Sequence, residues 1–75
     1  MKIYMNFAAD SGIDAYDYGY DWVQIQFKDG SIFEYTRGSA GSQIIEAMKN
    51  RALLGKDLYS FIQTHAGTLH SRRLR

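Results

Sequence analysis

The fold is decided by the stretch VQIQFKDGSIFEYT, which covers residues 23–36. Val23, Ile25 and Phe27 alternate with polar side chains, the dipeptide Asp29-Gly30 follows, and a second run rich in apolar residues comes after it. Two such runs around this dipeptide are typical of a β-hairpin. We therefore predict an antiparallel hairpin here.

The turn of this hairpin allows two registers. A two-residue turn would pair Lys28 with Ser31 and would mix polar and apolar side chains on both faces. A type I turn with Gly30 as the bulge residue pairs Phe27 with Ser31 and gathers five apolar or aromatic side chains on one face: Val23, Ile25, Phe27, Phe33 and Tyr35. Since a slip of one residue exchanges the two faces, we predict the bulged register, with Phe33 and Tyr35 in the core.

Two more strands are predicted before the hairpin and two helices after it. Alternation of period two indicates a short strand over residues 3–7 and a second extended segment over residues 13–18. Together these elements predict an α+β fold. We expect a small antiparallel β-sheet of three to four strands, packed on one face by two C-terminal helices.

The first helix is predicted from about Ser42 to Arg51, after a flexible connector over residues 37–42. Either Ser39 or Ser42 is expected to cap it. Its apolar side chains recur at spacings of three and four, at Ile44, Ile45, Met48 and Ala52. Gly55 interrupts the pattern, and a shorter helix capped by Asp57 is expected to end at Ala66-Gly67.

Length and composition bound the kind of protein. Seventy-five residues make one domain at most, which we place at residues 1–67, followed by a basic tail over residues 68–75 that we expect to be disordered. The absence of cysteine excludes disulfides, thiol catalysis and cysteine-bound zinc. No oligomeric state follows from the sequence.

The N-terminal residues carry no targeting signal that we can identify. They lack the long apolar core of a signal peptide, and no apolar run approaches the length of a membrane span. We therefore expect a cytoplasmic location and no membrane partner.

Several short segments of the chain form a set: Ser11-Gly12-Ile13, Tyr18, residues 23–27, Lys28-Asp29-Gly30-Ser31, Phe33-Glu34-Tyr35, Gly55-Lys56, Leu58-Tyr59 and Ile62. Together they resemble one known family, the KTSC domain. Phe33-Glu34-Tyr35 falls where the family has its central Tyr-x-Tyr motif. The resemblance covers about three quarters of the chain, from Ser11 to about His65, and the order of strands, helix, Gly-Lys pair and short helix also agrees.

The resemblance implies a domain without an assigned function. The family is named after a C-terminal domain of some lysyl-tRNA synthetases and also occurs as short stand-alone proteins, and RNA binding is implied by that association. Ser39-Ala40 stand where the family often has a Val-Pro pair. Ser60-Phe61 stand where it often has an Asn and a basic residue, and this departure removes polar groups that a ligand site might have used.

Catalytic and metal-binding patterns are not found. The two histidines, His65 and His70, lie near the C-terminus, and no serine has a supporting motif. The acidic residues Asp10, Asp14, Asp17 and Asp21 do not have the spacing of a calcium loop. We therefore expect no catalytic residue, no bound metal and no cofactor, and we do not expect an enzyme.

Uneven charge makes nucleic acid a candidate partner. Residues 1–34 carry two basic against six acidic side chains, whereas residues 35–75 carry seven basic against two acidic. RNA contacts are predicted at Arg37, Gly38, Ser39, Gly41, Ser42, Lys49, Lys56, Arg72, Arg73 and Arg75. Tyr16, Tyr18, Tyr20 and Trp22 recur at every second residue, and such a row either stacks bases or packs in the core and at turns.

The alternative function is that of an accessory protein that binds another protein or a small ligand. The two hypotheses predict different surfaces. One continuous basic face favours nucleic acid, whereas basic residues scattered among acidic ones favour a protein or small-ligand partner.

Overall fold

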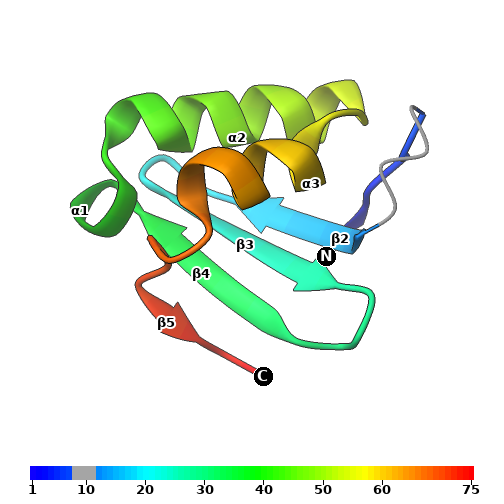
Figure 1. Cartoon of the computed structure of the whole chain (residues 1–75), viewed down its shortest axis with the longest axis horizontal. Helices are drawn as coiled ribbons and strands as arrows, with labels where there is room; N and C mark the ends of the chain where they lie inside the picture. Colours follow the sequence, from blue (N-terminus) through cyan, green and yellow to red (C-terminus); the bar gives the residue numbers. More distant parts are fainter. Residues whose placement is uncertain (8–11) are drawn as a thin grey trace.

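One antiparallel sheet forms the base of the molecule. The computed structural model describes residues 1–7 and 12–75. In this part of the chain, five strands follow one another in the sheet in sequence order (Figure 1). They are β1 (Lys2–Ile3), β2 (Ile13–Tyr18), β3 (Trp22–Phe27), β4 (Ile32–Thr36) and β5 (Arg72–Arg73). The predicted α+β architecture is confirmed, and β5 is a further edge strand that was not predicted. Asp10 and Ser11 lie outside the described residues.

The helices cover one face of this sheet (Figure 1). They are α1 (Arg37–Ala40), α2 (Ser42–Leu54) and α3 (Leu58–Phe61), and α3 continues into the π-helical segment η1 (Ile62–Ala66). The buried side chains of the helical layer are Ile45, Met48 and Ala52 of α2, Leu58 of α3, and Ile62 and Ala66 of η1. They pack against Val23, Ile25 and Tyr35 from the sheet in a single core.

The hairpin has the predicted bulged register. Val23 lies opposite Tyr35, and Ile25 lies opposite Phe33. The Phe27 N–H donates to the Ser31 carbonyl over 2.8 Å, and the Gly30 N–H donates to the Phe27 carbonyl over 2.9 Å. Gly30 has a φ of 90°, a left-handed conformation that glycine adopts without steric cost. The turn chemistry and the burial pattern therefore select the same register.

The N-terminal segment differs from its predicted strand. β1 ends at Ile3, and the side chains of Ile3, Met5 and Phe7 are exposed, whereas Tyr4 is buried. The backbone N–H of Tyr4 donates to the carbonyl of Asp14, and the Tyr4 hydroxyl accepts a hydrogen bond from the backbone N–H of Leu58 over 3.1 Å. This pairing turns Tyr4 rather than its apolar neighbours toward the core.

The predicted connector after β4 is helical, and its capping was predicted wrongly. Thr36 caps α1: its hydroxyl accepts the Ser39 N–H over 3.1 Å, while the Ser39 hydroxyl accepts the Thr36 N–H over 3.0 Å. This reciprocal pair satisfies two backbone donors at once. Ser39 is thus part of the preceding turn, and α2 begins after Gly41 without a side-chain cap.

Asp57 is not a side-chain cap either. It precedes α3 in a left-handed conformation, with a φ of 65°, and its side chain makes no capping hydrogen bond. The first N–H of α3, that of Leu58, donates to the Tyr4 hydroxyl instead. A residue distant in sequence therefore does what we expected of the local aspartate.

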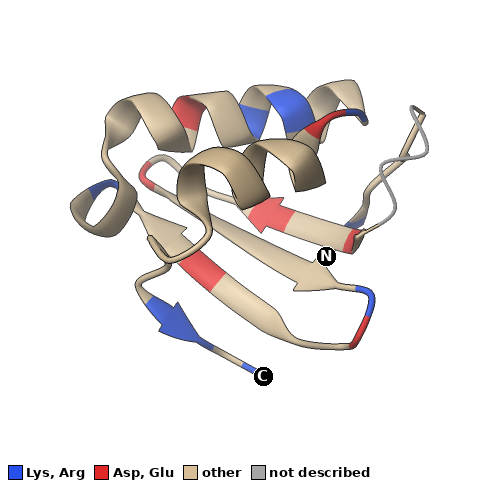
Figure 2. Cartoon of the chain, in the orientation of Figure 1, with Lys and Arg blue, Asp and Glu red and all other residues tan. Residues whose placement is uncertain are grey.

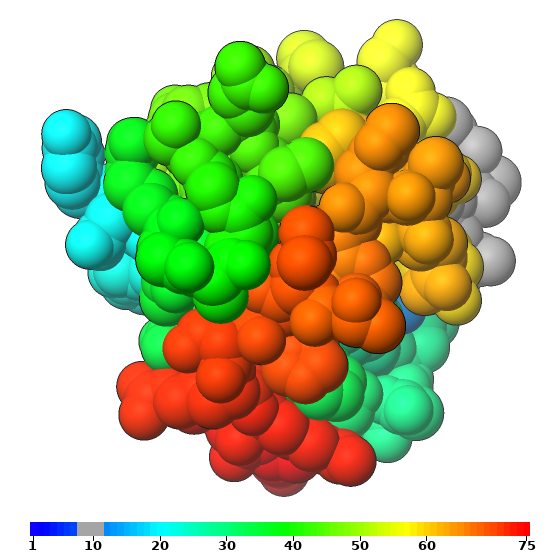
Figure 3. Space-filling view, turned by 60° about the vertical axis from the view of Figure 1, so that its left-hand side comes forward, coloured from blue at the N-terminus to red at the C-terminus, as the bar shows by residue number. Residues whose placement is uncertain are grey.

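The tail, which we expected to be disordered, forms β5 at the edge of the sheet. Arg72 pairs with Glu34 and Arg73 with Phe33. The backbone N–H groups of Ser71 and Leu74 donate to the carbonyls of Glu34 and Ile32, each over 2.7 Å. Figure 3 shows the red tail against the orange C-terminal helical segment. β4 would otherwise present an unpaired edge, and the tail satisfies these groups.

Gly30→Ala tests the hairpin turn. The substitution should lower the free energy of unfolding by about 1–2 kcal/mol, because an L-residue is strained in the left-handed region. The space around the glycine is open, so no steric overlap adds to this cost. The measurement is chemical denaturation of the variant and the parent.

The matched control is Gly38→Ala. Gly38 lies in α1 without a positive φ, and an added Cβ would make only an ordinary contact with Thr36. Stability should stay unchanged or rise by about 0.5–1 kcal/mol. Equal effects of the two substitutions would contradict the bulged turn.

Candidate ligand-binding site

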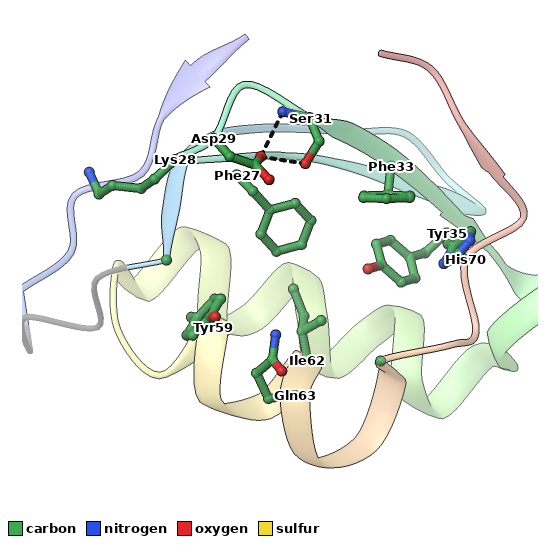
Figure 4. A pocket seen from close by; sticks show the side chains of 12 residues that line it. Phe27, Lys28, Asp29, Ser31, Phe33, Tyr35, Tyr59, Ile62, Gln63 and His70 are labelled. Carbon is green, nitrogen blue, oxygen red and sulfur yellow. Dashed lines mark hydrogen bonds between the residues drawn. The ribbon is translucent and has the colours of Figure 1, made fainter.

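A cavity of about 470 Å³ lies between the β3–β4 hairpin and the C-terminal helical segment (Figure 4). Residues that are far apart in the sequence meet there, because the hairpin face that Phe27, Phe33 and Tyr35 share lies beneath α3 and η1. The lining residues are Gly12, Phe27, Lys28, Asp29, Ser31, Phe33, Tyr35, Tyr59, Ile62, Gln63, Gly67 and His70. The volume is within the range of sites for small molecules.

Aromatic rings form the walls of the cavity. The ring of Phe27 is edge-to-face with that of Phe33, with centroids 5.8 Å apart, and with that of Tyr59, with centroids 6.4 Å apart. The imidazole of His70 lies against Phe33, with centroids 4.7 Å apart. Ile62 closes the wall on the helical side (Figure 4). The walls are therefore suited to a flat, apolar body.

Two charged residues lie at the hairpin end of the cavity. Asp29 accepts hydrogen bonds from the hydroxyl of Ser31 over 2.6 Å and from its backbone N–H over 2.9 Å. These two bonds, the hydroxyl first, hold the pKa of Asp29 below its usual value of 3.8. Lys28 extends away from the cavity and its ammonium pairs with Asp14 over 2.8 Å (Figure 4). Both charges are thus already engaged.

Tyr35 places a polar atom inside the cavity. The residue is 2% exposed, and its hydroxyl points into the cavity from β4 (Figure 4). Among the residues that the structure describes, none hydrogen-bonds to this hydroxyl. Burial raises the pKa of Tyr35 to about 12, so that the group stays a neutral phenol able both to donate and to accept. The Gln63 amide extends toward the same space from η1 (Figure 4).

In the described part of the chain, the Ser31 hydroxyl donates to Asp29, and no hydrogen bond joins it to either histidine. A search of the same residues finds no group of three His, Cys, Asp or Glu side chains able to hold a metal ion. None of the helices described is long and apolar enough to cross a membrane.

The residues predicted to contact RNA do not come together on one face. Figure 2 shows basic residues on α1, α2, the hairpin turn and β5, with acidic residues among them. Gly38 and Ser39 lie in α1, and Gly41 and Ser42 lie where α2 begins. Lys56 follows the far end of α2, roughly 20 Å away for a helix of 13 residues.

Most of these basic side chains have acidic partners or ring contacts. Arg37 and Lys49 both pair with Glu46, over 3.0 Å and 3.2 Å. Arg72 pairs with Glu34 over 2.9 Å. The guanidinium of Arg73 lies 5.5 Å from the ring centroid of Phe33, and its Nε donates to the backbone carbonyl of Arg75. Of these ion pairs, the one between Arg72 and Glu34 joins the basic half of the chain to the acidic half.

The aromatic row of residues 16–22 is divided between different surroundings. Tyr16 is in the core and stacks with Tyr18, with centroids 6.3 Å apart. Tyr20 is 82% exposed at the β2–β3 turn, under the guanidinium of Arg37. Trp22 precedes the buried Val23 by one residue and therefore lies on the opposite face of the sheet. Core packing and turn edges account for this row.

Comparison with protein-family models, with curated proteins and with solved structures finds no match. The resemblance to the KTSC domain accordingly remains a prediction.

The sequence predicted part of the cavity and missed the rest. Phe27, Phe33 and Tyr35 were placed on one face, but only as core residues. Gln63 and His70 were not predicted as site residues, and Tyr59 entered only through the resemblance. The missing information was the position of the C-terminal segment over the hairpin, which no local pattern contains.

Tyr35→Ala tests how far this residue is structural. Truncation of the buried ring should lower the free energy of unfolding by about 3–5 kcal/mol. Tyr35→Phe should leave the melting temperature within about 2 °C of the parent, because the hydroxyl has no protein partner to lose. Thermal melts of both variants measure this.

Tyr20→Ala is the control, since this exposed tyrosine loses only its cation contacts and should cost less than about 1 kcal/mol. A melting temperature of Tyr35→Ala close to that of the parent would contradict the buried position of the ring.

Glu34→Gln tests the pairing of the tail through its pH dependence. Hydrogen bonds from Gln24 and then Arg72 lower the pKa of Glu34 from its usual 4.5. The resulting stabilisation is present above pH 4.5 and is lost as the pH falls through the lower pKa of the folded state. Its size should be at most about 1 kcal/mol, as for other pairs near the surface.

The unfolding free energies of parent and variant should therefore differ at pH 7 and converge in acid. Arg72→Ala leaves the Gln24 bond in place. The difference in unfolding free energy between parent and Arg72→Ala should therefore change less with pH than the difference between parent and Glu34→Gln. A constant difference between parent and Glu34→Gln at all pH values would rule out this role of the carboxylate.

Proposed function

We propose that the protein is a small non-catalytic binding module whose site is the cavity between the β3–β4 hairpin and the C-terminal helical segment. The observation that carries this proposal is the Tyr35 hydroxyl, which points into the cavity from a buried side chain and has no hydrogen-bond partner among the described residues. Water that enters the cavity can bond to this hydroxyl, and a ligand that displaces the water has to replace that hydrogen bond. A bound ligand supplies the partner that the protein does not.

The distribution of charge favours a small ligand over nucleic acid. A phosphate backbone is held by several cations along one track. Here Arg37 and Lys49 share Glu46, Arg72 pairs with Glu34, and Lys56 lies at the other end of α2. The basic groups are scattered among acidic ones (Figure 2), the pattern that we expected for a protein or small-ligand partner.

The proposal also gives a role to the segments that resemble the KTSC domain. With the exception of Gln63, Gly67 and His70, every residue of the cavity lining belongs to one of those segments. Phe33 and Tyr35, at the positions of the central motif, form its inner wall. In this interpretation, the residues that resemble the family surround a ligand site rather than an RNA-binding surface.

Gln63→Trp tests the site by filling it. Gln63 is exposed on η1 and extends toward the cavity, so an indole at this position occupies the space without disturbing the core. A set of small water-soluble organic compounds is screened by amide chemical shifts. Compounds that bind should shift Phe27, Ser31, Phe33 and Gln63 in the parent, and the shifts should disappear in Gln63→Trp.

The control is Gln43→Trp, an exposed position on α2 away from the cavity lining, which should retain all binding. Single-stranded RNA is titrated in parallel at low and high salt. If RNA binds with a steep salt dependence, if removal of residues 71–75 weakens that dependence, and if no compound binds in the cavity, the proposal is wrong and the RNA hypothesis is supported.

A further inference from the structure

We propose that the part of the ligand that the cavity recognises is an uncharged planar ring carrying a hydrogen-bonding group, with the ring among Phe27, Phe33 and Tyr59 and its polar group bonded to the Tyr35 hydroxyl. This inference rests on the function proposed above and specifies its ligand class. Three features of the cavity carry it: the shape of its walls, the state of its charges and the position of the Tyr35 hydroxyl.

The walls select a flat ring. The planes of Phe33 and Tyr59 each make an angle of 71° with the plane of Phe27, at centroid distances of 5.8 Å and 6.4 Å. Aromatic rings attract one another in offset-stacked or edge-to-face pairs at centroid distances of about 4.5–7 Å. A planar ring can adopt such pairs with more than one wall at once, whereas a saturated ring of equal size has no face to offer.

The charges near the cavity select a ring without charge. Asp29 is hydrogen-bonded twice by Ser31, and Lys28 is paired with Asp14. The guanidinium of Arg73 lies over the ring of Phe33, and its positive charge helps to balance the negative charge of Asp29. An ionic ligand would lose its hydration in the cavity without meeting an uncompensated opposite charge.

The depth of Tyr35 selects a ring with a polar group. The hydroxyl can donate and accept, and the Gln63 amide, which extends toward the cavity from η1, offers both a donor and an acceptor. An amide-like edge, with a carbonyl next to an N–H or NH₂, complements both side chains. A purely hydrocarbon ring would displace water from the hydroxyl and leave it unpaired, so the site discriminates against it.

Four compounds separate these features: benzamide, cyclohexanecarboxamide, benzoate and benzylammonium. They share a six-membered ring and differ in planarity or charge. Each is titrated into the protein, and dissociation constants are obtained from the amide shifts of the cavity residues. Benzamide should bind at roughly millimolar concentration, as expected for a compound of this size, and the other three more weakly.

Tyr35→Phe should weaken benzamide roughly three- to tenfold, the effect of one lost hydrogen bond, without a change in melting temperature. Toluene, which has no hydrogen-bonding group, should bind this variant at least as well as it binds the parent. An unchanged benzamide affinity in Tyr35→Phe would overturn the role of the hydroxyl. Tighter binding of benzylammonium than of benzamide would show a site for organic cations and would overturn the ligand class.

The outcomes distinguish this inference from the function on which it rests. If none of the four compounds shifts the cavity residues at roughly 10 mM, while other compounds of the wider screen do so and lose this effect in Gln63→Trp, only the ligand class is wrong. If the wider screen also fails, the proposed function fails with it.

Discussion

The turn between β3 and β4 is the constraint on which both the core and the cavity depend. Gly30 in its left-handed conformation adds one residue to the turn and pairs Phe27 with Ser31. In the alternative register, Phe33 and Tyr35 would exchange faces with Glu34. The charged carboxylate would then lie under the helices, and the inner wall of the cavity would face solvent. A single backbone conformation therefore determines where the aromatic residues of β4 lie.

Contacts between distant parts of the chain then position the other wall of the cavity. The hydroxyl of Tyr4 accepts the first N–H of α3, which ties the start of this helix to the N-terminal segment. Leu58, Ile62 and Ala66 anchor α3 and η1 to the core, and the side chains of Tyr59 and Gln63 line the cavity. At the opposite end, pairing of β5 with β4 brings His70 against Phe33. The cavity thus depends on both chain termini.

Features held by residues near one another in the sequence could be predicted, whereas features held by residues far apart in the sequence could not. The hairpin was predictable because its turn residues and its alternating side chains lie within 14 positions and favour the same register. The caps at Ser39 and Asp57 were predicted wrongly because Thr36 and Tyr4 make the competing hydrogen bonds. β5 was missed because it is held by backbone hydrogen bonds to the carbonyls of Ile32 and Glu34. The composition of the tail does not indicate such bonds. For the cavity, the sequence predicted the shared face of the hairpin but not the segment that closes it.

Tyr35 is the position at which stability and binding make opposite demands. A phenylalanine would fill the same volume, keep the contacts of the ring and bury no polar atom, so the demands of the core alone do not account for the hydroxyl. Sequences that specify one structure break such local rules mainly at functional sites. The cost of an unpaired hydroxyl is small while water can enter the cavity, and it becomes large when an apolar compound excludes that water. The same atom therefore leaves the free protein stable and gives the cavity its selectivity, since only a ligand that returns the hydrogen bond avoids that cost.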